Sequence, residues 1–308
     1  LTKGTIMRII FHGQQAFGKS VLEALLDRGE DIVAVFCAPD KEGGRPDPLK
    51  EFALEKGLPL HQPASYKNKE AEELVASYNS DLCVMAFVTL FVPEEVLYIP
   101  THGTIQYHPS LLPMHRGPSS INWPIIQGST KTGLSIFWPD NGLDEGPILM
   151  QKECEITPDD TLGTVYFDKL FPMGVEAMLE SVDLVKAGKA PKDVQDLSKG
   201  SYESWAKASI AEVDWSKPAA EVHNLIRGTD PAPGAWTIID GKKLGLFDCR
   251  RVEEAAGDAG TVVAVDDDGV TIAAGDGGGV RLGRVRPEGE GKIAGKDAGI
   301  AVGTKLGA

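Results

Sequence analysis

The chain has 308 residues, with 31 basic and 45 acidic side chains and a formal net charge of −14. Hydrophobic residues make up 42% and charged residues 25%, a composition that excludes extensive disorder. The acidic balance argues against a partner held mainly through phosphates, because nucleic-acid binders need a basic face. At about 100–200 residues per domain, the length predicts two domains.

Cysteine content and apolar runs indicate the cellular compartment. The four cysteines lie far apart and show no metal-binding spacing, which favours buried free thiols in a reducing, cytoplasmic setting. No apolar run approaches the roughly 18 residues of a membrane span, and no signal peptide is visible, so we expect no membrane partner. Residues 1–6 are expected to be a cloning remnant before a natural start at Met7. The oligomeric state, and whether a longer protein contains this chain, stay open.

Short apolar runs alternate with helical patterns along the first 190 residues. This alternation predicts an α/β domain with a Rossmann-like, mainly parallel sheet, whose ligands bind beyond the carboxyl ends of the strands. A long amphipathic helix is expected over Thr161–Gly188, followed by a polar linker at Lys189–Tyr202. The strands are expected at Met7–His12, Asp31–Cys37, Leu58–His61, Leu82–Phe87, Thr104–His108, Gly133–Trp138 and Ile148–Ile156.

The pattern of apolar and polar residues changes near residue 200. Short strand-like runs are separated there by turns such as Asp266–Gly269 and Gly275–Gly279, which predicts a small antiparallel, OB-like β-barrel. Residues 201–308 hold 13 basic and 17 acidic side chains, a net charge of −4. We therefore expect a catalytic domain over 7–204 and a C-terminal barrel domain over 205–308.

A first motif, Gly13–Ser20, reads GQQAFGKS and matches the phosphate-binding pattern GxxxxGK[ST] between a strand and a helix. Phe17 would crowd a bound phosphate, and no strand-terminal Asp follows in a clear magnesium-binding context. The alternative is structural: Gly13 allows a tight turn, Phe17 fills the core and Lys19 is solvated. A P-loop-like nucleotide-binding module thus remains a competing function.

A second motif lies at the end of the strand Thr104–His108. Gln106 and His108 point to the same side of an extended chain, and a downstream acidic loop contains Asp144. A His, an amide and a carboxylate at strand ends suit acyl transfer, because the His can donate to a developing oxyanion and the carboxylate can take a proton. Strand-end His and Asp residues also serve as turn caps, so spacing alone leaves both readings open.

Longer stretches carry a family resemblance. HPSLLPMHRG at His108–Gly117, SINW at Ser120–Trp123 and GLDEG at Gly142–Gly146 resemble the formyltransferases that depend on 10-formyltetrahydrofolate. The stretch Ser135–Thr161 is similar nearly throughout to the N-terminal hydrolase domain found in 10-formyltetrahydrofolate dehydrogenases, and the likeness also extends to methionyl-tRNA formyltransferases. It runs from Met7 to Trp236 and implies the two-domain fold expected above.

The resemblance also implies catalytic residues. The family uses an Asn-x-His pair and an Asp 36 residues after the His, and His108 and Asp144 match this pattern in type and spacing. Gln106 stands at the Asn position, a departure from the pattern. Its amide lies one methylene further from the backbone than that of Asn. Whether it reaches the formyl oxygen in the right position therefore stays open, since a displacement of about 1 Å can lower the rate greatly.

Folate contacts are implied at two loops. The pteridine would lie between Phe87, Val88, Thr89 and Leu90 on one side and Asp140, Asn141 and Gly142 on the other. For Phe91, packing in the core is as good an interpretation as folate contact. For Phe87, packing in the core is the structural alternative to folate contact. His115 and Arg116 would face the acceptor or form a solvated loop pair. No metal ligand set is visible.

These features predict an enzyme of one-carbon metabolism with 10-formyltetrahydrofolate as formyl donor and tetrahydrofolate as product. The acceptor would be water, giving formate, or a small acceptor. An amine such as methionyl-tRNA or an amino sugar nucleotide is the alternative. The acidic C-terminal part makes tRNA unlikely without excluding it.

Overall fold

The computed structural model describes residues 6–307, and its contacts divide the chain into two compact units. One unit comprises Leu1–Arg116, Gly133–Glu153 and Leu170–Tyr202. The other comprises Gly117–Thr132, Cys154–Lys169 and Glu203–Ala308. The expected remnant lies outside the described residues except for Ile6. The domain boundary expected near residue 205 stays a prediction. Within residues 6–307, no helix is long and apolar enough to cross a bilayer.

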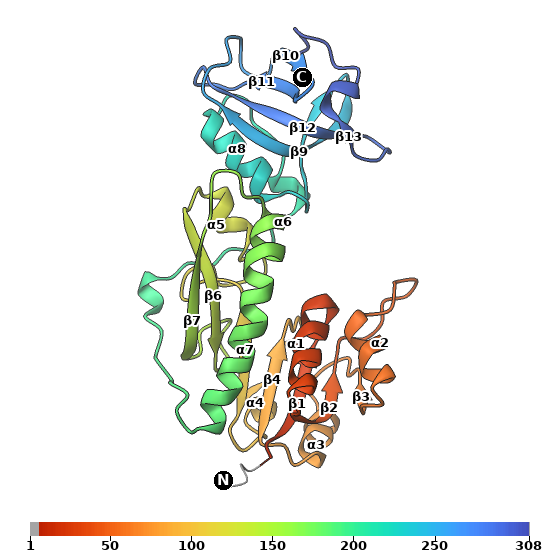
Figure 1. Cartoon of the computed structure of the whole chain (residues 1–308), viewed down its shortest axis with the longest axis vertical. Helices are drawn as coiled ribbons and strands as arrows, with labels where there is room; N and C mark the ends of the chain where they lie inside the picture. The colour runs from red at the N-terminus through yellow and green to blue at the C-terminus, as the bar shows by residue number, and fades with distance from the viewer. Residues whose placement is uncertain (1–5, 308) are drawn as a thin grey trace. The chain divides into compact units, whose positions relative to one another are not determined.

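The first sheet has seven strands in the order β3-β2-β1-β4-β5-β6-β7. Strands β1 to β5 pair in parallel, whereas β6 runs antiparallel to β5. The central strands are apolar on both faces, as parallel strands covered by helices must be, and Figure 1 shows β1, β2 and β4 beside α1. The bounds are β1 Arg8–Gly13, β2 Asp31–Phe36, β3 Leu60–His61, β4 Leu82–Ala86, β5 Thr104–His108, β6 Lys131–Phe137 and β7 Ile148–Glu155.

Helices cover both faces of this sheet. One face packs against α3 and α4 through a cluster that includes Phe36, Tyr66, Val75 and Met85. On the other face, the Phe17 ring of α1 packs at a tilt against Tyr107, with ring centroids 4.3 Å apart. Among the described residues the α-helices are α1 Gln15–Asp27, α2 Pro48–Glu55, α3 Lys69–Ser77, α4 Glu94–Leu97, α5 Asn122–Ile126, α6 Leu162–Thr164, α7 Phe171–Lys186 and α8 Ala219–Gly228.

The expected helix over Thr161–Gly188 is interrupted. It begins as α6, passes through a π-helical segment at Val165–Leu170 and continues as α7. Pro172 lies in the first turn of α7 and has no N–H to donate to the carbonyl four residues earlier, which accounts for a break in the regular α-helical ladder at this point.

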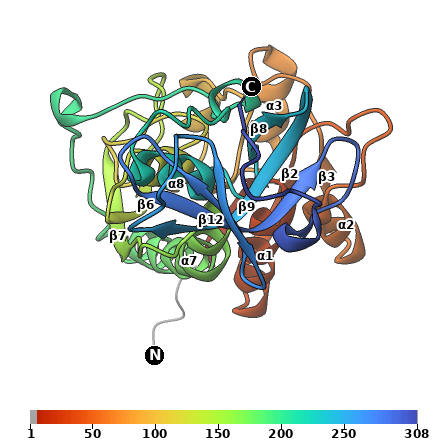
Figure 2. The same ribbon diagram turned by 90° about the horizontal axis from the view of Figure 1, so that it is seen from above.

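The second sheet is antiparallel, in the order β10-β11-β12-β9-β8, with β13 paired to β12. Figure 2 shows β9 and β12 side by side, and their residues pair from Leu244 to Val252. Helix α8 buries Val222 and Ile226 in the core of this unit. The α/β class and the antiparallel C-terminal sheet are thus confirmed. The bounds are β8 Ala235–Ile239, β9 Lys242–Val252, β10 Val262–Asp266, β11 Gly269–Ala273, β12 Gly279–Pro287 and β13 Ile293–Ala294.

Two buried histidines predict a pH dependence of stability. Burial lowers the pKa of His12 to about 3 and that of His223 to about 4, from an ordinary value of 6.5. Between pH 6.5 and those values the unfolded chain binds more protons, so the free energy of unfolding should fall as the pH drops. The slope for each His is at most about 1.4 kcal/mol per pH unit.

Urea denaturation at pH 7 and pH 5 measures this slope. The variant His12→Ile removes one of the two groups and should show a flatter dependence than the parent chain. An unchanged slope in the variant would mean that His12 titrates normally in the folded state.

Candidate functional site

His108 is the last residue of β5, at the carboxyl edge of the parallel strands, and its side chain is buried. Its Nε2 lies 3.0 Å from the carbonyl oxygen of His115. A carbonyl can only accept, so Nε2 carries a proton and donates it. This bond fixes the ring and leaves Nδ1 on the side of Asp144, whose Oδ2 is 3.7 Å away.

Asp144 reaches His108 from a loop that folds back along the sheet. Because β6 is antiparallel to β5, its last residue, Phe137, pairs with Gln106 rather than with the strand end. The loop that follows must therefore return toward the edge before Asp144 can face His108. Asp144 is buried and has a φ of 57°, a left-handed conformation that is strained for a residue with a side chain.

Gln106 shares the His108 face of the sheet. It is two residues before His108 in β5 and pairs with Met85 of β4, which in turn pairs with His12 of β1. Side chains at paired positions of adjacent strands emerge on one face, so His12, Met85 and Gln106 form a row across three strands. The amide of Gln106 is partly exposed, unlike His108.

The two loops expected to hold a pteridine take defined conformations. Phe87 follows β4 with a φ of 63° and a side chain 44% exposed, and Phe91 is 49% exposed, so neither ring is packed in the core. In the acidic loop, Asp140 accepts from the Gly142 N–H at 2.8 Å. The remaining loop members are Val88 and Leu90, which pack against the α3/α4 face, and Thr89, whose hydroxyl donates to Gln14 at 3.4 Å.

Reciprocal hydrogen bonds tie the acidic loop to the start of α4. The Glu94 N–H donates to Asn141 Oδ1 at 3.3 Å, and the Asn141 N–H donates to Glu94 Oε1 at 3.2 Å. Glu94 lies four residues after Leu90, so the segment that follows β4 and the acidic loop are directly connected. The sequence contained no sign of this link.

His115 and Arg116 are held by neighbours within the same unit. The His115 N–H donates to the Ser201 hydroxyl at 2.9 Å, while its carbonyl accepts from His108. The Arg116 guanidinium forms an ion pair with Glu145, the residue after Asp144. The expectation of a freely solvated pair is therefore wrong for their backbone and for the Arg116 charge.

Gln195 is a positioning residue that sequence reasoning missed. Its buried amide donates to the carbonyl of Asp144 at 3.0 Å and to that of Gly146 at 2.6 Å, which fastens the acidic loop from outside. Gln195 lies in the polar stretch expected to be a linker. That stretch instead packs on the first unit, where Asp193 bridges Ile148. Only tertiary contacts distinguish it from a solvated linker.

The Gly13–Ser20 turn has structural contacts at several of its positions. The Gln15 N–H donates to both carboxylate oxygens of Asp47, at 2.8 and 3.0 Å, so a carboxylate stands where a phosphate would bind and would repel it. A Cβ on Gly13 would lie 2.7 Å from the Ala86 carbonyl oxygen. Phe17 is buried, and Lys19 lies over the Phe52 ring at 5.4 Å.

The described residues thus form a buried imidazole–carboxylate pair at the carboxyl edge of a doubly wound sheet. Such a pair can accept and return a proton, and an imidazole N–H can stabilise a developing oxyanion. No group of three or more His, Cys, Asp or Glu side chains in the described part of the chain is arranged to hold a metal ion. Fold and site together define an α/β enzyme capable of acyl-group chemistry.

Comparison with known proteins agrees with that class. Residues 7–182 match the family described as formyl transferase, and residues 207–300 match its C-terminal domain. The chain belongs to the formyl transferase family.

Two relatives illustrate the breadth of that family. The human cytosolic 10-formyltetrahydrofolate dehydrogenase is 44% identical over 246 residues, which are 78% of this chain but only 27% of the dehydrogenase. The methionyl-tRNA formyltransferase of Trichlorobacter lovleyi is 38% identical over 275 residues, 88% of this chain and 86% of that protein. This chain therefore spans about a quarter of the length of the dehydrogenase.

Two solved structures share the fold. HypX from Aquifex aeolicus, in complex with tetrahydrofolic acid, aligns with a TM-score of 0.68 and 21% identity over 95% of this chain and 47% of its own. WlaRD, a sugar 3N-formyl transferase in the presence of dTDP and 5-N-formyl-THF, aligns with a TM-score of 0.71 and 17% identity over 93% of this chain and all of its own.

Proposed function

We propose that this chain removes the N10-formyl group of 10-formyltetrahydrofolate and passes it to water or to a small acceptor, with tetrahydrofolate as the other product. The observation that carries the proposal is the buried pair of His108 and Asp144, with Nε2 of His108 committed to the His115 carbonyl and Nδ1 directed toward the carboxylate. Membership in the formyl transferase family supports the choice of donor.

The geometry suggests separate roles for His108 and Asp144 in the reaction. With Nε2 bound to a carbonyl, His108 can donate to the formyl oxygen only from Nδ1 and only in its protonated form, and Asp144 Oδ2 lies 3.7 Å from that nitrogen. Asp144 also accepts the proton of the attacking nucleophile. As the nucleophile bonds to the formyl carbon, the C–O pair moves to oxygen. On collapse the C=O bond re-forms, the C–N10 bond breaks, and N10 takes the proton that Asp144 had accepted. Gln106 supplies a second donor from the same face.

The donor would bind at the two linked loops. In this proposal Phe87–Leu90 and Asp140–Gly142 hold the pteridine through backbone edges and apolar walls, and the Glu94–Asn141 hydrogen bonds keep the loops in register. The exposed Phe87 ring offers a face for a flat aromatic ligand. His115 and Arg116 line the acceptor side, and the ion pair of Arg116 with Glu145 partly neutralises that side.

Transfer to an amine is the second candidate. It is favoured by the match to a methionyl-tRNA formyltransferase over most of both chains, whereas release of formate is favoured by the likeness to the dehydrogenases. The net charge of −4 over residues 201–308 disfavours tRNA as acceptor. A cytoplasmic location, a catalytic part ending near residue 204 and a C-terminal part from 205 belong to the same proposal.

One assay tests this function and separates its two forms. The protein is incubated with 10-formyltetrahydrofolate alone and with amines, and tetrahydrofolate, formate and formylated amine are quantified. We expect one tetrahydrofolate for each formyl group transferred. If no tetrahydrofolate forms under any condition and ATP with magnesium binds tightly, the chain acts through the Gly13–Ser20 turn and the proposal fails.

A further inference from the structure

The two groups that face the ring nitrogens of His108 both belong to residues with a strained backbone. His115, whose carbonyl accepts from Nε2, has a φ of 54°, and Asp144, whose carboxylate faces Nδ1, has a φ of 57°. Left-handed values are uncommon for residues that carry a side chain, and they persist only where the surroundings hold them. The two loops beside His108 therefore need support from their neighbours.

The residues that follow His115 and Asp144 form an ion pair with each other. Arg116 comes directly after His115, Glu145 comes directly after Asp144, and the Arg116 guanidinium contacts the Glu145 carboxylate. Consecutive Cα atoms are about 3.8 Å apart, so the ion pair joins the two loops one residue away from each partner of His108. The contacts form a closed ring of five residues: His108, His115, Arg116, Glu145 and Asp144.

This ion pair is partly withdrawn from water. The Arg116 side chain is 15% exposed and the Glu145 side chain 36% exposed. The Arg116 Nε is buried and has no hydrogen-bond partner within residues 6–307, so this guanidinium depends strongly on its contact with Glu145. Water and salt screen a partly buried pair much less than an exposed one. Loss of either charge should therefore loosen both loops.

Other contacts hold each loop separately. The Ser201 hydroxyl accepts from the His115 N–H at 2.9 Å, and the Gln195 amide donates to the Asp144 carbonyl at 3.0 Å. The ion pair differs from these contacts because it joins the two loops to each other. It therefore bears on the distance between the two groups that face the His108 ring.

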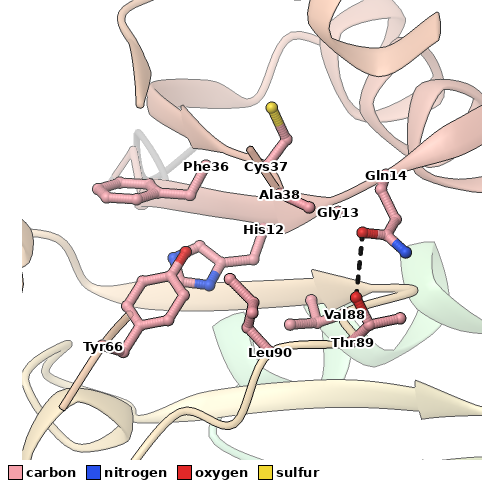
Figure 3. Close-up of a pocket in the computed structure, with 10 residues that line it drawn as sticks. All are labelled: His12, Gly13, Gln14, Phe36, Cys37, Ala38, Tyr66, Val88, Thr89 and Leu90. Atoms are coloured by element: carbon pink, nitrogen blue, oxygen red, sulfur yellow. Dashed lines mark hydrogen bonds between the residues drawn. The ribbon is translucent and has the colours of Figure 1, made fainter. Parts of the chain in front are cut away.

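The loops proposed to hold the pteridine have supports of their own. Figure 3 shows Thr89 bonded to Gln14, the residue before α1, with 3.4 Å between the hydroxyl and the side-chain oxygen. Asn141 is tied to Glu94 by the two hydrogen bonds described above. Loss of the ion pair should therefore alter the surroundings of His108 more than the affinity for folate.

We propose that Arg116 and Glu145 are positioning residues, which hold the His115 carbonyl and the Asp144 carboxylate at the two ring nitrogens of His108. The inference rests on the proposed function. The ion pair acts through its neighbours: it keeps the carbonyl on Nε2, so that Nδ1 is the nitrogen left to work on the formyl oxygen beside Asp144.

Arg116→Met and Glu145→Met each remove one charge and keep an unbranched side chain. A Cβ built on Gly142 would lie 2.8 Å from the Glu145 Cβ, so methionine preserves the close packing there. With 10-formyltetrahydrofolate and no amine, the kcat for tetrahydrofolate release should fall at least about tenfold in each variant, because small displacements are costly. The dissociation constant of 5-formyltetrahydrofolate should stay within about twofold of the parent value.

Two further variants test whether the residues act as a pair. The double variant Arg116→Met/Glu145→Met should be no slower than the slower single variant, because both substitutions break one contact. Arg116→Lys keeps a cation beside Glu145 and should turn over at least about threefold faster than Arg116→Met.

Lys152→Met is the matched control. It breaks the ion pair between Lys152 of β7 and Glu180 of α7 in the same unit, whose side chains are 25% and 52% exposed. We expect its turnover to equal that of the parent chain.

NMR of isotope-labelled histidine ring nitrogens reports where the His108 proton lies, and the signals are assigned by their loss in His108→Ala. The parent chain should carry the proton on Nε2. Arg116→Met should populate both tautomers, because the His115 carbonyl is no longer held in place. A variant that is only less stable would keep the parent tautomer, and this result would overturn the proposal.

The kinetic outcomes are also decisive. Parent-like turnover in both Met variants, an equal loss in Lys152→Met, or a loss in Arg116→Met alone would overturn the proposal and leave formyl cleavage standing. Absence of tetrahydrofolate with the parent chain would instead refute the proposed function itself.

Discussion

Replacement of His108 by alanine is expected to lower the turnover number for tetrahydrofolate release by about a thousandfold or more. In the proposed mechanism the variant loses the N–H that donates to the formyl oxygen, and Asp144, the proposed proton acceptor, loses the ring beside it; such groups contribute about 10²–10⁴-fold each. Affinity for the unreactive analogue 5-formyltetrahydrofolate should change little, since the proposed pteridine contacts lie in other loops. Steady-state kinetics and equilibrium titration measure the two quantities.

A matched control exists in the same sequence neighbourhood. His102 is exposed and precedes β5, so His102→Ala removes an imidazole without touching the pair. We expect its turnover to equal that of the parent chain. Full activity in His108→Ala would show that the site assignment is wrong.

The second large effect is expected for Gly146→Ala. A Cβ at this position would lie 1.8 Å from the carbonyl oxygen of Trp138, so the backbone at the base of the acidic loop must move. At that point the Trp138 N–H donates to the Pro147 carbonyl oxygen at 2.8 Å, which joins the two ends of the acidic loop. We expect the free energy of unfolding to fall by about 3 kcal/mol. Turnover should fall by about a hundredfold, because Asp144, two residues away, is displaced.

Gly291→Ala is the control for this substitution. No atom lies within 4 Å of a Cβ built there, and its φ is outside the left-handed region. Its unfolding free energy should stay within about 0.5 kcal/mol of the parent value. Urea denaturation and turnover measured on both variants test the comparison. Parent-like behaviour of Gly146→Ala would mean that the acidic loop adapts and does not need this close approach.

The strands and their buried character were predictable, because parallel strands covered on both faces are apolar throughout. Leu82–Phe87 was expected, and β4 covers Leu82–Ala86. Strand direction was not predictable from such a run. The antiparallel course of β6 makes the acidic loop fold back, so the distance between His108 and Asp144 could not be deduced from their spacing.

The residues that hold the site loops in place could not be predicted from the sequence, for a different reason. Gln195 and Ser201 lie in a polar stretch with no periodicity, and their roles depend on hydrogen bonds to backbone groups far away in the chain. His12 shows the opposite case. A lone His at a strand end is usually paired, and only the surrounding side chains reveal that its ring nitrogens have no partner within residues 6–307.

A double-mutant cycle on tetrahydrofolate release tests the central claim, that His108 and Asp144 act as one unit on the formyl group. Turnover of 10-formyltetrahydrofolate is measured for the parent chain, His108→Ala, Asp144→Asn and the double variant. Residues that act as a unit are non-additive, so the double variant should be about as slow as the slower single variant. Losses that multiply in the double variant, or a single variant with full turnover, would contradict the account.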